Sequence, residues 1–479
     1  MAREVVLGVD SSTQSTKVVA VDLETGAVLG EGRAPHTGED IQDPNDWWAA
    51  LRIAVSAAVS DGLVVRGLAV AGQQHGCVTI DAAGEPVRPS PLWNNVASAP
   101  DADRLNSLAD FTTAIGTRLV ASITITKLAH LRRTAPNDLA RTVSVGLPHD
   151  WLNLKLTGEL ATDRGEASGS GWWSPSEGRL RRDLLALAVG EEHAQRLQLP
   201  VVRGPQEPAG VLSSSAAAEL GLPAGIPVGP GTGDNMGAAI GVGAAPGEYV
   251  ISLGTSGTAF AVSEHATADL SGAVCGFADA TGRFMPLACM LNCTRVFDTI
   301  ATLLGIPRNE ALDRAGQVEP GADGLLLVPY LAGERTPNLP VASGTIFGLT
   351  AGTAAPHNFL RAAVDGVAAG LAYCVEALQR LGVTAPIVTL VGGGSAHPTW
   401  QQAIADATGL PVVVRAGGEH CARGAATQIA AIVRGESIAE LAKLWRPPTI
   451  AEVQPRHGLR EAFALGRREY LIEEIRANS

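Results

Sequence analysis

One pattern occurs twice in this chain, near its start and again after its midpoint. In each copy an apolar run is followed by a turn rich in serine, threonine or glycine and then by a second apolar run, over residues 5–22 and 249–262. Two β-rich runs around a short turn predict a hairpin. Because the same hairpin opens both halves, the sequence predicts an internally duplicated fold.

The segments between the hairpins alternate between helix and strand patterns. A third strand at 27–30 extends the first hairpin into a meander. The other expected elements are helices near 47–61, 147–156, 362–381 and 398–408 and strands at 64–71 and 387–391. Such alternation predicts mixed α/β layers.

The length of the chain argues for more than one domain. Its 479 residues exceed the roughly 250 to 300 at which a single hydrophobic core stops growing. A stretch of small residues at 237–247 ends in a chain-breaking Pro-Gly pair. We therefore expect an N-terminal lobe over 1–245, a C-terminal lobe over 246–440, and a C-terminal helical segment over 441–479 that packs back on the lobes.

An excess of acidic residues narrows the range of partners. The chain has 48 Asp and Glu against 36 Lys and Arg, a formal net charge of −12, which disfavours a surface that neutralises nucleic-acid phosphates. No run of ~18 apolar residues predicts a membrane span, and the apolar run at the start is too short for a signal peptide. We expect a cytoplasmic protein whose partners are small molecules, neither nucleic acid nor membrane; a homodimer stays open.

The six cysteines carry no recognisable metal or disulfide pattern. They show no Cys-x-x-Cys spacing, and the nearby histidines supply no full ligand set. We interpret them as small buried apolar residues.

The two hairpin turns are the first candidate binding elements. Successive backbone N–H groups and hydroxyls in a tight turn form an anion-binding concavity. The same residue types fill ordinary hairpin turns, so it is the occurrence in both halves that favours phosphate binding. The chain has no Gly-x-x-x-x-Gly-Lys-Ser/Thr motif, and the glycines at 231 and 233 lack the third glycine of a dinucleotide fingerprint.

Two aspartates lie where a carboxylate could act on a phosphoryl group. Asp10 ends the first strand at the edge of its turn, where it could hold hydrated Mg²⁺ or simply initiate the turn. Asp234 precedes an expected helix and follows a glycine-rich segment. It could be a helix N-cap, or a base kept ionised by the helix N-terminus and able to accept a hydroxyl proton. The surrounding glycines favour the second interpretation because they let a ligand approach the backbone.

Two further glycine-bounded segments follow strands. Residues 72–76 read Gly-Gln-Gln-His-Gly and suit hydrogen bonding to a polyol, although a single histidine at a strand end is also compatible with a structural role. Residues 392–395 read Gly-Gly-Gly-Ser, and their bare backbone could pack against a nucleoside or simply close a turn between packed elements.

Taken together, these segments resemble the FGGY carbohydrate kinases over essentially the whole chain. The most specific stretch is 344–365, which resembles the C-terminal signature of that family. The stretches 72–76, 92–94, 231–235, 253–257 and 330–337 are similar to the xylulokinase branch. The duplication and the resemblance point to an α/β fold of two ribonuclease-H-like lobes, as in actin, Hsp70 and the sugar kinases, with an ATP cleft between them.

The resemblance also implies site residues, a sugar-binding N-terminal lobe and a nucleotide-binding C-terminal lobe. Asp234 is implied as the catalytic base and Asp10 as the residue near the metal, with ATP and Mg²⁺ as cofactors and D-xylulose as the sugar. The implied sugar contacts are Gln74, His75, Trp93, Asn94, Asp234 and Asn235. The implied nucleotide contacts are Ser12, Thr13, Thr16 and Lys17 in the first turn, Gly254, Thr255, Ser256 and Gly257 in the second, and Gly393, Gly394 and Ser395.

One departure from the family pattern concerns the sugar. Xylulokinases usually continue Trp-Asn with Asp-Thr-Arg, whereas this chain has Asn95, Val96 and Ala97, and Asn338 replaces a common histidine. The alternatives are therefore a kinase of another ketopentose or polyol, or a non-catalytic sugar sensor of the same fold. A chaperone-like ATPase is disfavoured because no peptide-binding β-domain follows and the chain ends in a charged helical segment at 459–475.

Overall fold

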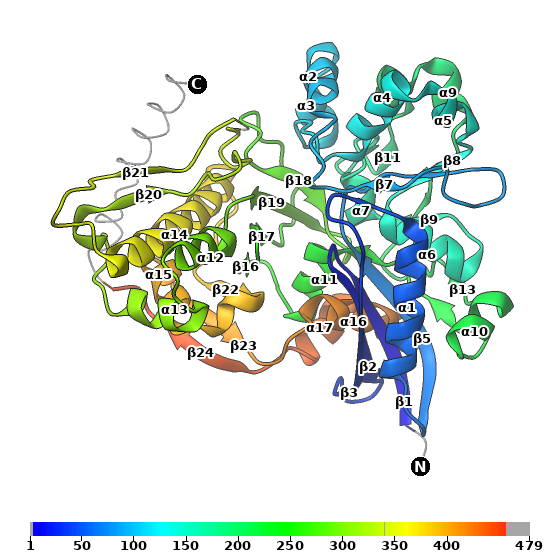
Figure 1. The fold of residues 1–479 in the computed structure, drawn as a ribbon. Coiled ribbons are helices and arrows are strands. Elements are labelled where there is room, and N and C mark those ends of the chain that lie inside the picture. Colours follow the sequence, from blue (N-terminus) through cyan, green and yellow to red (C-terminus); the bar gives the residue numbers. More distant parts are fainter. Residues whose placement is uncertain (1–2, 340, 457–479) are drawn as a thin grey trace.

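The computed structural model describes residues 3–339 and 341–456, which form two lobes (Figure 1). The first lobe is built on a sheet with the strand order β13–β14–β5–β1–β2–β3. Strands β1 to β3 form an antiparallel meander, β5 runs parallel to β1, and β14 runs parallel to β5. The strands are β1 (Arg3–Ser11), β2 (Ser15–Asp22), β3 (Val28–Pro35), β5 (Leu63–Gly72), β13 (Gly210–Val211) and β14 (Pro227–Val228).

The second lobe has a sheet of the same design, in the order β18–β19–β17–β16–β22–β23–β24. Its antiparallel hairpin β16–β17 corresponds to β1–β2, and β22 and β23 continue in parallel as β5 and β14 do. The strands are β16 (Tyr249–Leu253), β17 (Gly257–Ala261), β18 (Cys275–Ala278), β19 (Phe284–Met290), β22 (Val388–Val391), β23 (Val412–Arg415) and β24 (Thr449–Val453). The predicted duplication is confirmed, and so is the ribonuclease-H-like α/β fold.

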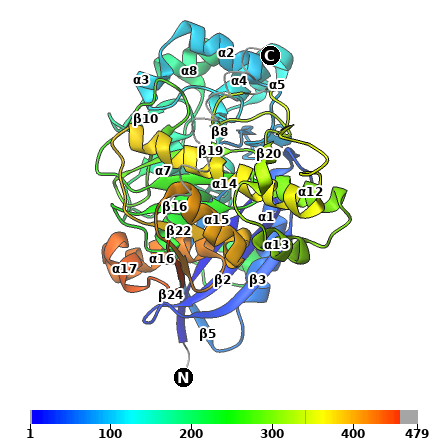
Figure 2. The same cartoon turned by 90° about the vertical axis from the view of Figure 1, so that its left-hand side faces the viewer.

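The central strands are apolar because helices cover the sheet. Residues 5–11 of β1 are all buried, which explains a run without polar alternation. Helix α1 (Pro44–Ala58) starts where the Asp43 carboxylate accepts the N–H of Asn45 at 2.9 Å and proline occupies the first turn. Helices α14 (Pro356–Arg380) and α15 (Pro398–Thr408) contribute to the core of the second lobe and lie on its face in Figure 2.

A group of helices lies between β5 and β14 in the sequence and has its own apolar core. Both views show these helices together at one end of the molecule, away from the N-terminus (Figures 1 and 2). They are α2 (Ala99–Leu108), α3 (Phe111–Ile115), α4 (Thr124–Thr134), α5 (Pro136–Arg141), α8 (Arg182–Val189) and α9 (Glu191–Arg196). No helix in the described ranges is long and apolar enough to cross a membrane.

Helix α16 (His420–Arg434) comes from the second half of the sequence but packs on the sheet of the first lobe. Figure 1 shows it in orange against the blue strands. It crosses α11 (Asp234–Gly241) so closely that a Cβ on Gly424 would overlap the carbonyl oxygen of Gly237. A Cβ on Gly8 of β1 would overlap the Ala422 carbonyl in the same way. Glycine is therefore needed at this crossing because only a bare backbone fits.

The C-terminal segment differs in part from the sequence prediction. After α17 (Ile438–Leu444) the chain forms strand β24, which pairs antiparallel with β23. The expectation of a helical segment over 441–479 is wrong for 449–453, where alternating exposure along the strand marks a sheet edge. The charged helix expected at 459–475 lies outside the described residues.

Candidate active site

Asp10 lies at the end of β1 and is 3% exposed. The hydroxyl of Ser12 donates to its carboxylate, and the Lys17 Nζ lies 3.5 Å away. Lys17 is shared with Glu419, at 2.7 Å, just before α16 begins. Burial raises the pKa of Asp10, while Lys17 and Ser12 oppose the increase. Lys17 and Ser12 therefore offset only part of the effect of burial on the pKa of Asp10.

Asp234 is the first residue of α11, and Gly233 takes the cap position. The interpretation of Asp234 as the N-cap is therefore wrong. Its carboxylate accepts the backbone N–H of Asn235 at 2.8 Å and the side-chain amide of Asn235 at 2.9 Å. The side chain is partly accessible. Burial, and then the negative charge of Asp10, raise the pKa of Asp234 to about 7.

Both carboxylates act electrostatically on a third group. The Cys421 thiol, at the start of α16, has a pKa raised well above its usual value by burial and then by Asp10 and Asp234. A cation near both carboxylates would relieve their repulsion, and Mg²⁺ would suit such a site because it needs few protein ligands and keeps several waters. No cluster of three or more metal-ligating side chains occurs in the described part of the chain.

The first turn has partly exposed side chains and a buried one. Ser12 and Thr13 are partly exposed, whereas Thr16 is fully buried and bonds the His36 Nε2 at 2.8 Å. The Thr16 hydroxyl is therefore engaged in the interior rather than free for a nucleotide.

The second turn is held in place by the residues that precede α12 (Thr294–Leu303) and by its first residue. The N–H groups of Cys293 and Thr294 donate to the carbonyls of Thr255 and Gly254, at 3.2 and 3.1 Å. Thr255 is exposed at the tip, Gly254 and Ser256 are partly exposed, and Gly257 is buried as it begins β17.

The glycines after β22 have two different roles. Gly392 has a φ of 87°, and Gly394 packs against Leu253, whose side chain would be 3.1 Å from a Cβ there. Gly393 has open space where a Cβ would be. The Ser395 hydroxyl donates to the Gly392 carbonyl at 2.8 Å. Gly394 thus serves packing against Leu253, whereas the backbone at Gly393 is left uncovered.

The polar residues after β5 are buried and connect the lobes. The Gln74 carbonyl oxygen accepts from the Asn235 amide at 3.2 Å, and the Asn235 oxygen accepts from the Thr258 hydroxyl of β17 at 2.9 Å. His75 has a φ of 67°, and its Nδ1 lies 3.1 Å from the Gly169 carbonyl. Burial, followed by nearby positive charges, holds the pKa of His75 well below its usual value, so the imidazole is neutral.

The structure separates Trp93 from the residues that follow it. The Trp93 indole donates to the Thr13 hydroxyl at 3.0 Å and so joins the first turn. Asn94 is exposed and donates to the Glu39 carbonyl at 3.1 Å, and the buried Asn95 amide donates to Asp40 at 2.7 Å. Val96 is 71% exposed. Only Trp93 of these residues contacts a predicted nucleotide-binding residue.

Several charged or reactive residues near the site were missed by the sequence analysis. Arg335 and Lys127 are the positive charges that act on His75, and burial lowers the pKa of Lys127 to about 7. The Arg335 guanidinium donates to the Cys275 thiol at 2.8 Å. Cys421 is partly exposed, so the interpretation of every cysteine as a buried apolar residue is wrong for this one. The stretch 330–337 offered a signal for Arg335, and nothing in the sequence singled out Lys127.

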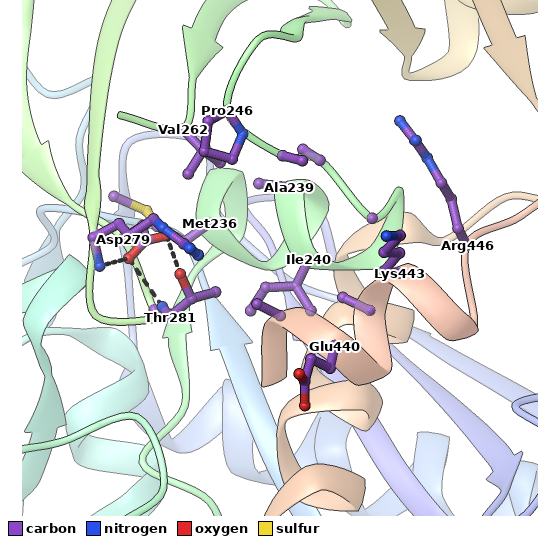
Figure 3. A pocket seen from close by; sticks show the side chains of 17 residues that line it. Met236, Ala239, Ile240, Pro246, Val262, Asp279, Thr281, Glu440, Lys443 and Arg446 are labelled. Carbon is purple, nitrogen blue, oxygen red and sulfur yellow. Dashed lines mark hydrogen bonds between the residues drawn. The ribbon is translucent and has the colours of Figure 1, made fainter. Parts of the chain in front are cut away.

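A separate cavity of about 310 Å³ lies along α11 beyond Asp234 (Figure 3). Met236, Ala239 and Ile240 line it from α11, and Lys443 and Arg446 lie in or just after α17. Residues of both halves of the chain therefore form its walls.

Comparison with known families accounts for this arrangement. The N-terminal domain model of the FGGY family of carbohydrate kinases matches residues 5–241, and the C-terminal domain model matches 249–432. The duplicated lobes and these matches define a two-lobed sugar kinase. The chain belongs to the FGGY family of carbohydrate kinases, and the predicted resemblance is confirmed.

Individual relatives are similar over most of their length. The chain is 43% identical to the xylulose kinase of Streptomyces coelicolor over 92% of this chain and 90% of that protein. It is 33% identical to the xylulose kinase of Escherichia coli over 86% and 87% of the two chains. The crystal structure of the xylulose kinase from Bifidobacterium adolescentis has a TM-score of 0.84 at 36% identity, covering 98% of this chain and 100% of that one.

Proposed function

We propose that the chain transfers the γ-phosphoryl group of MgATP to the 5-hydroxyl of D-xylulose, giving D-xylulose 5-phosphate and ADP. The similarity to xylulose kinases over most of both chains supports this substrate. The observation that carries the chemistry is the pair Asp10 and Asp234, whose carboxylates interact electrostatically next to the Asn235–Thr258 bond between the lobes.

Asp234 acts as the general base. Its oxygen accepts the hydroxyl proton while the sugar oxygen forms a bond to the γ-phosphorus, and the bond from that phosphorus to the β–γ bridging oxygen breaks. ADP leaves with the bonding electrons. A base whose pKa is about 7 is well matched to proton acceptance near neutral pH.

Asp10 holds the hydrated Mg²⁺ that accompanies ATP and offsets phosphate charge. The backbone N–H groups of the two turns receive the phosphates, with Lys17 and Thr255 nearest the transferred group. Gly393 leaves room for the adenosine, since nothing lies where its Cβ would be.

The sugar lies against Gln74, His75, Trp93 and Asn235. The Gln74 side-chain amide nitrogen is buried without a partner in the described residues, and a sugar hydroxyl would satisfy it. A neutral His75 can donate to or accept from a hydroxyl as its tautomer requires. Asn94 contributes less, because its amide is bonded to the Glu39 carbonyl.

A related sugar is the second candidate substrate, and one observation favours it. Asn95 is engaged with Asp40, and Val96 is exposed, so this stretch offers the sugar neither the carboxylate nor the guanidinium usual at 95 and 97 in the xylulokinase branch. A buried hydroxyl left without a partner costs ~1 to 3 kcal/mol, roughly one or two orders of magnitude in affinity.

The test is a coupled kinase assay over D-xylulose, other ketopentoses, gluconate, glycerol and pentitols. We expect the highest kcat/KM for D-xylulose and a fall in kcat of at least ~10²-fold in Asp234→Ala with sugar binding retained. Asp103→Asn, an exposed acidic residue of α2, is the control. Wild-type turnover in Asp234→Ala would exclude its role as the base, and preference for another sugar would replace D-xylulose as the substrate.

A further inference from the structure

Asp234 is preceded by the segment 230–233, which is buried throughout. Gly231 has a φ of 77°, and a Cβ there would lie 2.5 Å from the His149 ring. Strand β15 (Thr232–Gly233) then pairs with the end of β5. The position of Asp234 therefore depends on how this short segment is held.

Three residues of the first lobe hold the two sides of the segment. The Pro230 carbonyl accepts the Asn153 amide at 2.9 Å and lies 3.0 Å from the His149 Nε2. The Thr232 hydroxyl donates to the Asp163 carboxylate at 2.9 Å. Between these contacts, the backbone N–H and carbonyl of Gly231 have no hydrogen-bond partner among the described residues 3–245.

Gln428 supplies both partners for Gly231. Its side-chain amide donates to the Gly231 carbonyl at 2.8 Å, and its oxygen accepts the Gly231 N–H at 3.0 Å. Gln428 is fully buried in α16. The Gln428 side chain thus pairs with the backbone of Gly231 in the way that a neighbouring strand would. Gly231 has a positive φ and therefore lies outside the regular strand pairing.

The same helix also contacts the Asp10 side of the site. Glu419 and Cys421, at its start, lie beside Lys17 and Asp10. From Cys421 to Gln428 the helix advances by about 10 Å, at ~1.5 Å per residue. Helix α16 therefore links the turn that carries Asp10 to the segment that carries Asp234.

We propose that Gln428 is a positioning residue that holds Asp234 in line with the sugar hydroxyl through the backbone of Gly231. This inference rests on the proposed function, because it takes Asp234 to be the base. Gln428 itself touches neither substrate.

The test compares Gln428→Met, which keeps the length of the side chain and removes both hydrogen bonds, with Thr427→Val as the matched control. Thr427 is the adjacent buried residue, and its hydroxyl bonds only within the helix, to the Arg423 carbonyl at 2.8 Å. We expect kcat of Gln428→Met to fall about tenfold or more, with KM for sugar and ATP within about threefold. Thr427→Val should keep wild-type kcat even where its melting temperature falls. If Gln428→Met does not fold, Gln428→Glu takes its place, because it keeps the shape of the side chain and an acceptor for the Gly231 N–H.

A double-mutant cycle with Asp234→Ala separates positioning from general stability. If Gln428 acts through Asp234, adding Gln428→Met to Asp234→Ala causes no further loss of residual turnover. Independent, multiplying losses would overturn the proposal, as would wild-type kcat in Gln428→Met. Full turnover in Asp234→Ala alone would instead overturn the assignment of the base, so the two failures are distinguishable.

Discussion

At the scale of single residues, the ionisation of Asp234 has a testable consequence. Its pKa is raised to about 7 by burial and by Asp10, and only the deprotonated carboxylate can accept the hydroxyl proton. We therefore expect kcat/KM for the sugar to rise with pH and level off above about pH 8, because kcat/KM reports ionisation in the free enzyme.

The negative charge of Asp10 predicts how the pH profile should shift when Asp10 is replaced. Replacing Asp10 by Asn removes a negative charge that raises the pKa of Asp234, so the rising part of the profile should move to lower pH in Asp10→Asn, together with a lower maximum. The measurement is the kcat/KM profile of both proteins at fixed Mg²⁺. An unchanged midpoint in the variant would contradict the electrostatic coupling.

The residues in and around the proposed site differ in how far the sequence predicted them. Asp10 and Asp234 were predictable because each stands beside a turn or a glycine-rich segment at the end of an apolar run. Gln428, Lys127 and Cys421 were not, because each lies within a helix where nothing local distinguishes it. Their importance comes from which distant backbone or charge they meet, and only the tertiary fold determines that.

At the scale of elements, the crossing of α11 and α16 depends on glycine. A Cβ at position 424 would meet the backbone of Gly237, which cannot move aside as a side chain can. Overpacking of this kind costs about 1 to 3 kcal/mol, which outweighs the ~1 kcal/mol that alanine gains in a helix. We expect Gly424→Ala to lower the free energy of unfolding, measured by denaturant titration.

Gly370→Ala is the control for this prediction. Gly370 also lies within a helix, α14, but its added Cβ would meet the flexible end of Met290, at 2.7 Å from Cε. This variant should stay within about 1 kcal/mol of wild type, since that side chain can adjust. Equal losses in the two variants would mean that the crossing is not specially tight.

Most helices and strands were predictable from the sequence pattern, but the elements against which they pack were not. The hairpins, α1, β5, α14 and α15 follow directly from apolar periodicity and turn residues. The assignment of α16 to the sheet of the first lobe could not be read from its sequence, because an apolar helix face does not specify which sheet it covers. Strand β24 was not predicted, because its five residues are too few to show a clear alternation of apolar and polar side chains and they follow a helix.

At the scale of the whole molecule, Thr258 and Asn235 form a hydrogen bond between the lobes at 2.9 Å, next to Gln74. Closure of the lobes excludes water from phosphoryl transfer. This bond connects Asn235, a proposed sugar contact, to β17 of the second lobe. We expect Thr258→Val to lower kcat/KM by about two- to tenfold, the equivalent of one hydrogen bond.

ATP hydrolysis without sugar is a second measurement on the same variant. It should change less than the kinase reaction, because the bond acts through Asn235, a proposed sugar contact. Thr302→Val, whose hydroxyl bonds within α12 on the surface, is the control. A Thr258→Val enzyme with wild-type kcat/KM would show that the bond between the lobes is dispensable.

The position of α16 also determines how this chain can be divided. A fragment ending near residue 245 would contain every strand of the first sheet and still lack the helix that covers Val6, Val19 and Ala69. We therefore expect that residues 5–241, which the N-terminal family domain matches, cannot complete their core when they are made alone. Ribosomal synthesis faces the same constraint, because the face of the first sheet that α16 covers cannot be completed until residues 420–434 have left the ribosome.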